Sequence, residues 1–537
     1  MAVKRSGEAS GLRDRRDPVR THKKLVAYAV GTALAATFTA LPLGGAATAT
    51  DERMALHVLN RVTFGPRTDD LGALRQKGVD AYIDGQLGPD RLADEVLGDR
   101  LSAFRTLGMS TAEINRTFAQ PLFEARRARR QTTADGADGR PTPMRQQIQR
   151  EANTPLTELA QQKVIRAVYS ERQLQEVLTD FWFNHFNVDA RKGIDRFLLT
   201  EYEREAIRPH VLGRFRELLN ATAKTPAMLF YLDNWMSADP NGPHAAAGRR
   251  AGPGGRAADS VIQRPNAPRG LNENYGRELL ELHTLGVDGG YTQKDVTEVA
   301  RAFTGWTIDR PRQGGGTFRF EPRIHDDGPK VVLGHRIERG GIRDGEEVLD
   351  ILARHPSTAR FIATKLTRRF VSDVPPPALV GRVAARFTAT DGDLRETMRA
   401  ILTSAEFRAA EAQGTKTRTP FEFIVAALRA TGADIVNAMP IVRQLQEQGM
   451  PLYQCQPPTG YRDTADAWTN TGALVARMNF AQALADRPSS VGVSSIESVD
   501  LRLVGGLSET TRSTIARAET DAQRLALTLG SPEFQKR

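Results

Sequence analysis

Apolar side chains recur three and four positions apart through most of the chain beyond residue 50. The pattern is clear at 55–65 (ALHVLNRVTFG), at 157–186 (TELAQQKVIRAVYSERQLQEVLTDFWFNHF) and at 394–407 (LRETMRAILTSAEF), with Gly, Pro or Asp between such segments. This spacing places the apolar side chains on one face of an α-helix. The chain has 537 residues, 40% of them hydrophobic, which suffices for a large buried core. The sequence therefore predicts a mainly α protein made of one or more multi-helix globular domains.

A short β element interrupts the helical pattern at 317–334 (TFRFEPRIHDDGPKVVLG). Phe318 and Phe320 alternate with other residues, the segment 326–329 has turn composition, and apolar residues resume at 331–333. Alternation on both sides of a turn is typical of paired antiparallel strands. We expect a small β-hairpin over 317–334.

The first 49 residues have the three parts of a secretory signal. A basic segment at 13–24 precedes an apolar segment at 25–41, and Ala47-Thr48-Ala49 has the small-x-small form of a cleavage site. We expect a secreted or extracytoplasmic protein, cleaved after Ala49. The general export route is favoured over the twin-arginine route, because Asp17-Pro18 directly follow Arg15-Arg16. The alternative is an uncleaved membrane anchor, since 25–41 is at the short limit for spanning a bilayer.

After the signal, we expect a single large helical domain over 50–484 and a partly helical C-terminal extension over 485–537. Two segments within the domain, 125–150 and 238–270, lack an apolar period and are rich in polar residues or in Gly, Pro, Ala and Arg. Such segments bury too little apolar surface to become ordered. Both are therefore predicted to be disordered insertions.

Charge and cysteine content exclude several kinds of site. Residues 1–24 carry half of the net charge of +10, and no basic stripe interleaved with aromatic residues appears, so nucleic-acid binding is not expected. Cys455 is the only cysteine, which excludes internal disulfides and Cys-based metal sites and favours a half-buried structural thiol. The motifs GxSxG, GxGxxG and HExxH and the P-loop are absent as well.

The stretch NENYGRELLELHTLGVDGGYTQKDV at 272–296 concentrates carboxylates, glycines and an imidazole. An α-helix over about 272–285 would place Asn274, Glu278 and Glu281 within about 60° of one another, opposite a buried stripe. Glu278 has no oppositely charged residue three or four positions away. This face is either a solvated, ion-paired surface or a ligand-binding site. His283 points away from it and is expected to be a core or helix-end histidine.

Two further histidines are candidate site residues. His185, in DFWFNHFNV, continues an apolar helical stripe and faces inward. It is either a core histidine bonded to a carbonyl, or a metal ligand or general base whose pKa is lowered by burial. His325 and Asp326 stand where the predicted hairpin turns, which would place an imidazole beside a carboxylate.

Several motifs together resemble one family. They are LNRVTFGPR at 59–67, DFWFNHFNV at 180–188, the stretch at 272–296, HDDGPKVVLG at 325–334 and QPPTGY at 456–461. In this order they are similar to the bacterial domain-of-unknown-function family 1800, over about 51–484. The resemblance implies a signal-bearing, mainly helical protein, often encoded beside an exported sulfatase-like protein that is a candidate assembly partner. It implies no catalytic residues.

We therefore expect an exported protein with a polar pocket that is hydrolytic or dependent on a divalent cation. His185 and His325 would transfer protons. Asn274, Glu278, Glu281 and Asp326 would supply ligands of the kind that Zn, Mn, Mg or Ca accept. The alternative is a non-catalytic cell-envelope protein that binds a polysaccharide or a protein partner. The sequence leaves open whether the chain is an enzyme.

Overall fold

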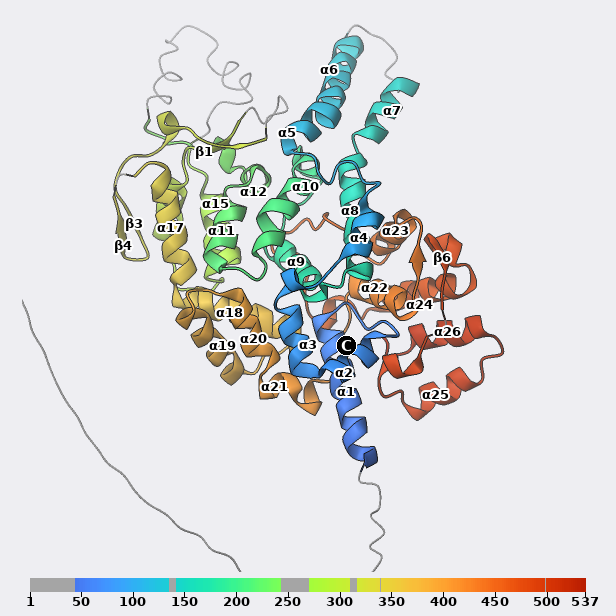
Figure 1. Ribbon diagram of the computed structural model, residues 1–537. Coiled ribbons are helices and arrows are strands. Elements are labelled where there is room, and N and C mark those ends of the chain that lie inside the picture. Colours follow the sequence, from blue (N-terminus) through green and yellow to red (C-terminus); the bar gives the residue numbers. More distant parts are fainter. Residues whose placement is uncertain (1–43, 135–141, 243–269, 310–315, 339, 498) are drawn as a thin grey trace, which may run out of the picture. The chain divides into compact units, whose positions relative to one another are not determined.

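The computed structural model describes residues 44–134, 142–242, 270–309, 316–338, 340–497 and 499–537. The chain forms two units, residues 1–47 and residues 48–537, and nearly all the described residues belong to the second. Helices dominate this unit, and its described strands form only two-stranded antiparallel sheets (Figure 1). The predicted mainly α fold class is confirmed.

Three helices provide much of the buried interior. Every residue of α22 (Pro420–Ala430) is buried, and α9 (Gln173–His185) is buried over most of its surface. A helix that is apolar nearly all round is stable only in a protein interior. The helix α8 (Thr154–Tyr169) packs against both of them. The periodic segment at 157–186 thus forms two helices of the core, as its pattern predicts.

The remaining helices are distributed along the whole unit. Before α8 come α1 (Gly44–Val62), α2 (Asp70–Lys77), α3 (Val79–Gln86), α4 (Glu95–Leu101), α5 (Thr111–Ile114), α6 (Gln120–Ala134) and α7 (Pro143–Glu151). Between α9 and α22 come α10 (Leu199–Glu201), α11 (Phe215–Ala223), α12 (Pro226–Tyr231), α15 (Glu273–Glu278), α16 (Gln293–Ala302), α17 (Ile342–Arg354), α18 (Pro356–Phe370), α19 (Pro377–Ala389), α20 (Leu394–Leu402) and α21 (Ala405–Arg408). After α22 come α23 (Met439–Glu447), α24 (Thr471–Asp486), α25 (Glu509–Ala516) and α26 (Asp521–Gly530). Short 3₁₀ turns are η1 (Pro89–Arg91), η3 (Asp195–Phe197), η5 (Arg208–His210), η6 (Asn234–Met236), η8 (Pro322–Ile324), η9 (Ala410–Ala412), η10 (Ala465–Ala467), η11 (Pro488–Val491) and η12 (Leu501–Val504).

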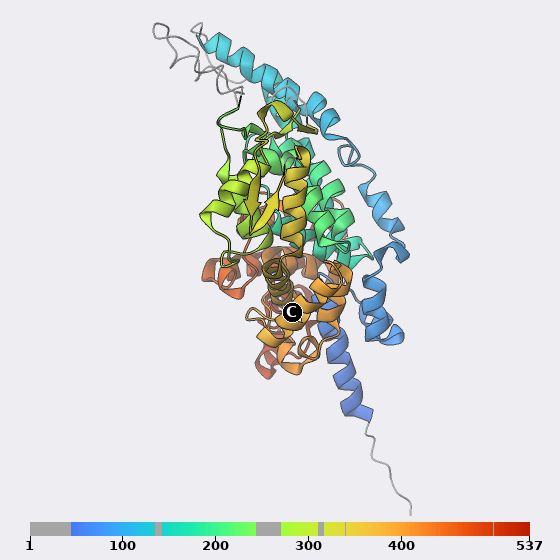
Figure 2. The ribbon, with the colours of Figure 1, turned by 90° about the vertical axis from the view of Figure 1, so that its left-hand side faces the viewer.

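Two groups of helices pack closely outside this interior. The helices α18, α19 and α20 pack against one another and lie together in both ribbon views (Figures 1 and 2). The helix α26 packs against α24, and Thr417 pairs with Lys536 across an antiparallel bridge. The segment 485–537, expected as an extension, is thereby part of the same unit as 50–484.

Three π-helical turns break the regular helical pattern: η2 (Asn115–Ala119), η4 (Tyr202–Ile207) and η7 (Leu279–Thr284). The single α-helix predicted over about 272–285 is wrong, because α15 continues directly into η7. The amide of Leu285 donates to the carbonyl of Leu280 at 2.8 Å, a five-residue step. Such a turn holds more than 3.6 residues, so the angles assumed for an α-helix do not apply beyond Glu278.

The strands form where the sequence predicts them but pair differently. β2 (Phe318–Phe320) pairs with β1 (Trp306–Ile308), and β3 (Lys330–Val332) pairs with β4 (His335–Ile337). The expected hairpin between 318–320 and 331–333 is therefore wrong. The reason is a tight turn directly after β3, where Leu333 and Gly334 have φ of 50° and 80° and reverse the chain into β4. A third pair joins β5 (Asp434–Ile435) to β6 (Val493–Ser495).

The structure describes most of the first expected insertion, 125–150, but little of the second, 238–270. The prediction that 125–150 lacks regular structure is wrong, because α6 extends to Ala134 and α7 covers 143–151. Arg, Ala and Gln are good helix formers, which supports helices even where no residue is buried, as in α7. Residues 135–141, and residues 243–269 of the second insertion, lie outside the described residues.

The predicted signal can be located only in part. Its apolar segment at 25–41 lies outside the described residues, whereas Ala47-Thr48-Ala49 lies in α1. None of the helices in the described ranges has both the length and the apolar character that crossing a bilayer requires.

Candidate functional site

His185 lies at the end of α9 with 1% of its surface exposed. Its Nε2 lies 3.1 Å from the carbonyl oxygen of His283, and its Nδ1 lies 2.9 Å from Nζ of Lys365. A carbonyl can only accept, so Nε2 carries the proton and Nδ1 accepts from Lys365. Burial, and then the charge of Lys365, lower the pKa of His185 well below its usual range. The ring is therefore neutral, as its inward position predicts.

The predicted carboxylate face lies on α15 and η7. Asn274 is exposed, while Glu278 and Glu281 are half-buried. Burial, and then the charge of Glu281, raise the pKa of Glu278 above its ordinary value. Arg277, which stands four residues before Glu281, donates instead to Oε1 of Gln293 at 2.6 Å. The charge of Arg277 still opposes the rise in the pKa of Glu278, but it offsets the repulsion between the two carboxylates only in part.

His325 and Asp326 are adjacent in sequence but face different partners. Nδ1 of His325 lies 2.8 Å from the carbonyl of Thr304, and its Nε2 lies 3.2 Å from Oδ2 of Asp344. The carboxylate of Asp326 accepts two hydrogen bonds from Arg301, at 2.7 and 3.0 Å. Both side chains therefore have their polar atoms occupied by the protein itself.

The predicted site residues engage different partners in the part of the chain that the structure describes. His185 contacts Lys365, the carboxylate pair stands on α15 and η7, and Asp326 is engaged by Arg301. Across the described ranges, no group of three or more His, Cys, Asp or Glu side chains is arranged to hold a metal ion. The metal site predicted from Asn274, Glu278, Glu281 and Asp326 is thus not assembled there.

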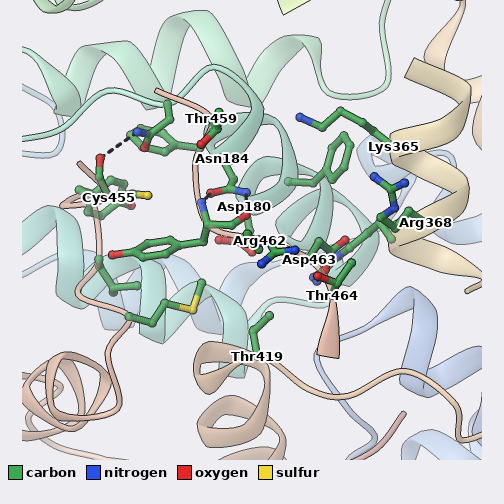
Figure 3. A pocket seen from close by; sticks show the side chains of 18 of the residues that line it. Asp180, Asn184, Lys365, Arg368, Thr419, Cys455, Thr459, Arg462, Asp463 and Thr464 are labelled. Carbon is green, nitrogen blue, oxygen red and sulfur yellow. Dashed lines mark hydrogen bonds and ion pairs between the residues drawn. The ribbon is translucent and has the colours of Figure 1, made fainter. Parts of the chain in front are cut away.

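A cavity of about 410 Å³ adjoins His185 on the side of Lys365 (Figure 3). Side chains from α8, α9, α18 and the segment 450–464 form its walls. This volume lies within the range of small-molecule sites, about 300–1,000 Å³. Its charged lining comprises Lys163, Lys365, Arg368, Arg369, Arg462, Asp180, Asp373 and Asp463. Cations outnumber carboxylates, so the pocket favours a ligand of negative charge.

Several of these charges neutralise one another. Nζ of Lys163 lies 2.7 Å from Asp180, and a guanidinium nitrogen of Arg369 lies 2.7 Å from Glu422 behind the pocket. The exposed guanidinium of Arg462 pairs with Asp466 on its own turn of chain. These cations are already paired and contribute little free charge to a ligand.

Lys365 and Arg368 are different. They stand three residues apart on α18, and so lie on one face of this helix. Both line the cavity, and Cys455 lies across the pocket from them in this view (Figure 3). Nζ of Lys365 donates to His185, and Nε of Arg368 donates to the carbonyl of Asp373 at 3.2 Å. Neither forms an ion pair with a carboxylate of the described chain. Burial lowers the pKa of Lys365 to about 8, opposed by Asp463 and reinforced by Arg368.

The wall formed by 455–461 is held against the end of α9 by two asparagines. Nδ2 of Asn187 donates to the carbonyls of Cys455 and Pro457, both at 2.9 Å. Asn184 accepts from the amide of Tyr461 at 2.7 Å and donates to its carbonyl at 2.8 Å. The segments DFWFNHFNV and QPPTGY, which are far apart in the sequence, are therefore joined by hydrogen bonds at one wall of the pocket.

Gly460 permits this close approach. Its φ is +74°, and a Cβ at this position would lie 2.2 Å from the carbonyl oxygen of Asn184. Only glycine meets both conditions without displacing the chain.

Cys455 lies in the wall of the pocket as a protonated thiol. It is 5% exposed, more buried than the half-buried position expected from the sequence. Burial raises its pKa to about 11, which disfavours the thiolate needed of a nucleophile.

The sequence reasoning missed Lys365 and Arg368. The available signal was the end of α18, KLTRRF, where basic residues interrupt an apolar helical period. Arg369 in that segment is only 4% exposed, so part of the basic run turns inward instead of solvating a surface.

Comparison with known proteins gives one match. A family model described as "Protein of unknown function (DUF1800)" matches residues 57–536, a range that includes the pocket and nearly all of 485–537. No curated protein and no solved structure matches the chain.

Proposed function

The chain belongs to the DUF1800 family, and from its pocket we propose that the protein binds a small anionic ligand through Lys365 and Arg368. The observation that carries this proposal is the ammonium group of Lys365, which lines the cavity without a carboxylate partner in the described chain. A partly buried charge without an ion-pair partner costs free energy, and Asp463 offsets this cost only in part, whereas a bound carboxylate or phosphate would supply a direct partner.

Arg368 fits the same ligand. Its guanidinium is one helical step from Lys365 and can form paired hydrogen bonds with an oxyanion. Thr459, Thr464 and Tyr461 add hydroxyl groups to the lining. Such a pocket suits a binding protein as well as an enzyme, and export of the protein remains part of the proposal.

Thermal unfolding of the purified protein tests the proposal, with inorganic phosphate and citrate as probes and sodium chloride at matched ionic strength as control. We expect each probe to raise the unfolding temperature of the wild type, because a ligand that binds only the folded state stabilises it. Arg368→Met should reduce the shift by at least half.

The matched control is Arg360→Met, which removes an exposed arginine from the same helix. It should keep the full shift. If neither probe stabilises the wild type beyond sodium chloride, or if Arg368→Met and Arg360→Met respond equally, the pocket is not the anion site.

A further inference from the structure

Lys365 differs from the other lysines of the buried regions in what its ammonium contacts. Lys163 and Lys330 each lie 2.7 Å from an aspartate oxygen. Nζ of Lys365 instead donates to the neutral ring of His185, at the wall of the cavity. Because the carbonyl of His283 fixes the proton of His185 on Nε2, the ring can only accept from Lys365. The nitrogen is thereby held in place without being neutralised.

The charged and titratable groups around Lys365 are His185 on α9, His283 on η7, Arg368 on α18 and Asp463 in the segment 450–464. Burial keeps both imidazoles neutral, with the pKa of His283 lowered to about 3. Asp463 is the one carboxylate that acts on Lys365, and burial outweighs it, so the pKa of the amine is lowered to about 8. Slightly above neutral pH, Lys365 is then a neutral amine in a fraction of the molecules, whereas an exposed lysine is almost fully protonated.

We propose that Lys365 forms an imine with an aldehyde or ketone group of the ligand, while Arg368 binds the anionic group of the same molecule. The inference rests on the proposed function, since both residues must engage one ligand. Its geometric basis is a fixed amine and an adjacent guanidinium on one face of α18, opening into a single cavity. The ligand class is a small carbonyl compound that also carries a carboxylate or phosphate.

The chemistry balances without a further reactant. The lone pair of the neutral Nζ attacks the carbonyl carbon, a C–N bond forms and the C=O π bond breaks. A proton passes from nitrogen to oxygen, giving a carbinolamine, whose hydroxyl takes up a second proton and leaves as water. From ammonium and carbonyl, the products are an iminium ion and water, with no net change in protons or electrons.

Reductive trapping tests this inference on the full chain. The protein is incubated with glyoxylate, which carries both an aldehyde and a carboxylate, and with cyanoborohydride, and the adduct is located by peptide mass spectrometry. We expect a dominant adduct on Lys365, with a trapping rate that is half-maximal near pH 8. Lys365→Arg should abolish this adduct while keeping the positive charge.

Two comparisons separate this inference from the proposed function. Arg368→Met also removes a charge that lowers the pKa of Lys365, so trapping of glyoxylate is compared with trapping of acetaldehyde, which lacks the carboxylate, in the same variant. The ratio of the glyoxylate rate to the acetaldehyde rate should fall at least tenfold. If phosphate still stabilises the wild type but glyoxylate labels Lys365 no faster than exposed lysines, the anion site stands and the imine is refuted. If phosphate fails as well, the proposed function itself is refuted.

Discussion

Lys365 carries its charge at a cost to the folded state. Its pKa is about 8 in the folded protein, against 10.5 for an ordinary lysine. Between these two values the unfolded chain binds more protons than the folded one, so stability attributable to Lys365 rises as the pH rises from about 8 to 10.5. Below this window the folded state bears the full penalty.

Lys365→Met should remove that pH dependence. At pH 7 we expect the variant, free of ligand, to be more stable than the wild type by up to about 3 kcal/mol, and the difference should shrink toward pH 10.5. Thermal unfolding at several pH values measures it. A difference that stays constant from pH 7 to 10.5 would show that the amine has an ordinary pKa.

Glu422 is the opposite case, a buried carboxylate that depends on its partners. It is 3% exposed and lies 2.7 Å from Arg369 and 3.0 Å from Arg537. Burial alone would raise its pKa, but the two guanidiniums lower it to about 2. Its contribution to stability is therefore present above pH 4.5 and is lost as the pH falls toward 2.

Glu422→Gln should destabilise the protein by about 3 kcal/mol at pH 7, because the buried guanidinium of Arg537 loses its carboxylate partner and Arg369 keeps only Asp463. Denaturant midpoints at pH 7 and pH 3 measure this, and the gap between variant and wild type should narrow at the lower pH. Glu411→Gln, at an exposed position, serves as control and should change stability by less than about 0.5 kcal/mol. Equal effects of the two substitutions would contradict the charge-pairing account.

At the scale of elements, the contact between α9 and the segment 455–461 holds one wall of the pocket in place. Asn187→Ala removes the two hydrogen bonds that this asparagine donates to the segment, each worth about 1 kcal/mol, and leaves those of Asn184. We expect the segment to open more often and Cys455 to react faster with a thiol reagent, by about tenfold. Since Cys455 is the only thiol, the labelling rate of the native protein reports this segment alone.

The exposed Asn274 offers a matched control, because Asn274→Ala removes the same amide far from this contact in sequence. Its labelling rate should equal that of the wild type. Should Asn187→Ala label no faster than Asn274→Ala, the asparagine does not hold the wall in place.

The elements also show what the sequence could predict. Apolar periodicity identified α8, α9 and α20, because a core-facing stripe is a local property of the chain. It could not reveal η7, since the extra residue of a π turn leaves no distinct spacing of apolar residues. The predicted strand pairing was wrong for a related reason. β2 pairs with β1, which precedes it in the sequence, and a turn that follows β2 carries no information about that partner.

The candidate site was predicted only where a single residue carried the signal. His185 stood out because an imidazole interrupts an apolar stripe, and it does adjoin the pocket. Lys365 and Arg368 could not be identified in this way, because basic residues on a helix are usually solvated. The contact between Lys365 and His185 also joins residues 180 positions apart in the sequence. The carboxylates of 272–296 were chosen because they are close together in the sequence. That closeness does not predict which way their side chains point.

For the whole molecule, the pocket depends on segments that are far apart in the chain. Residues from Lys163 to Thr464 line it, and Arg369 and Arg537 meet on Glu422 behind it. The family match from 57 to 536 covers all the lining residues. The N-terminal residues 1–49 lie outside that match, so their removal should leave the pocket intact.

This independence gives the last prediction. We propose that residues 1–49 direct export and are removed after Ala49, as their basic, apolar and small-residue segments suggest. Expressed in a bacterial host, the exported protein should begin at Thr50 by intact mass and should keep the phosphate-dependent thermal shift. Ala49→Leu should block cleavage, because signal peptidase requires a small residue there, while Ala46→Leu should leave it unchanged. An exported protein with the mass of the whole chain would refute cleavage, and loss of the thermal shift on removal of 1–49 would show that the pocket depends on them.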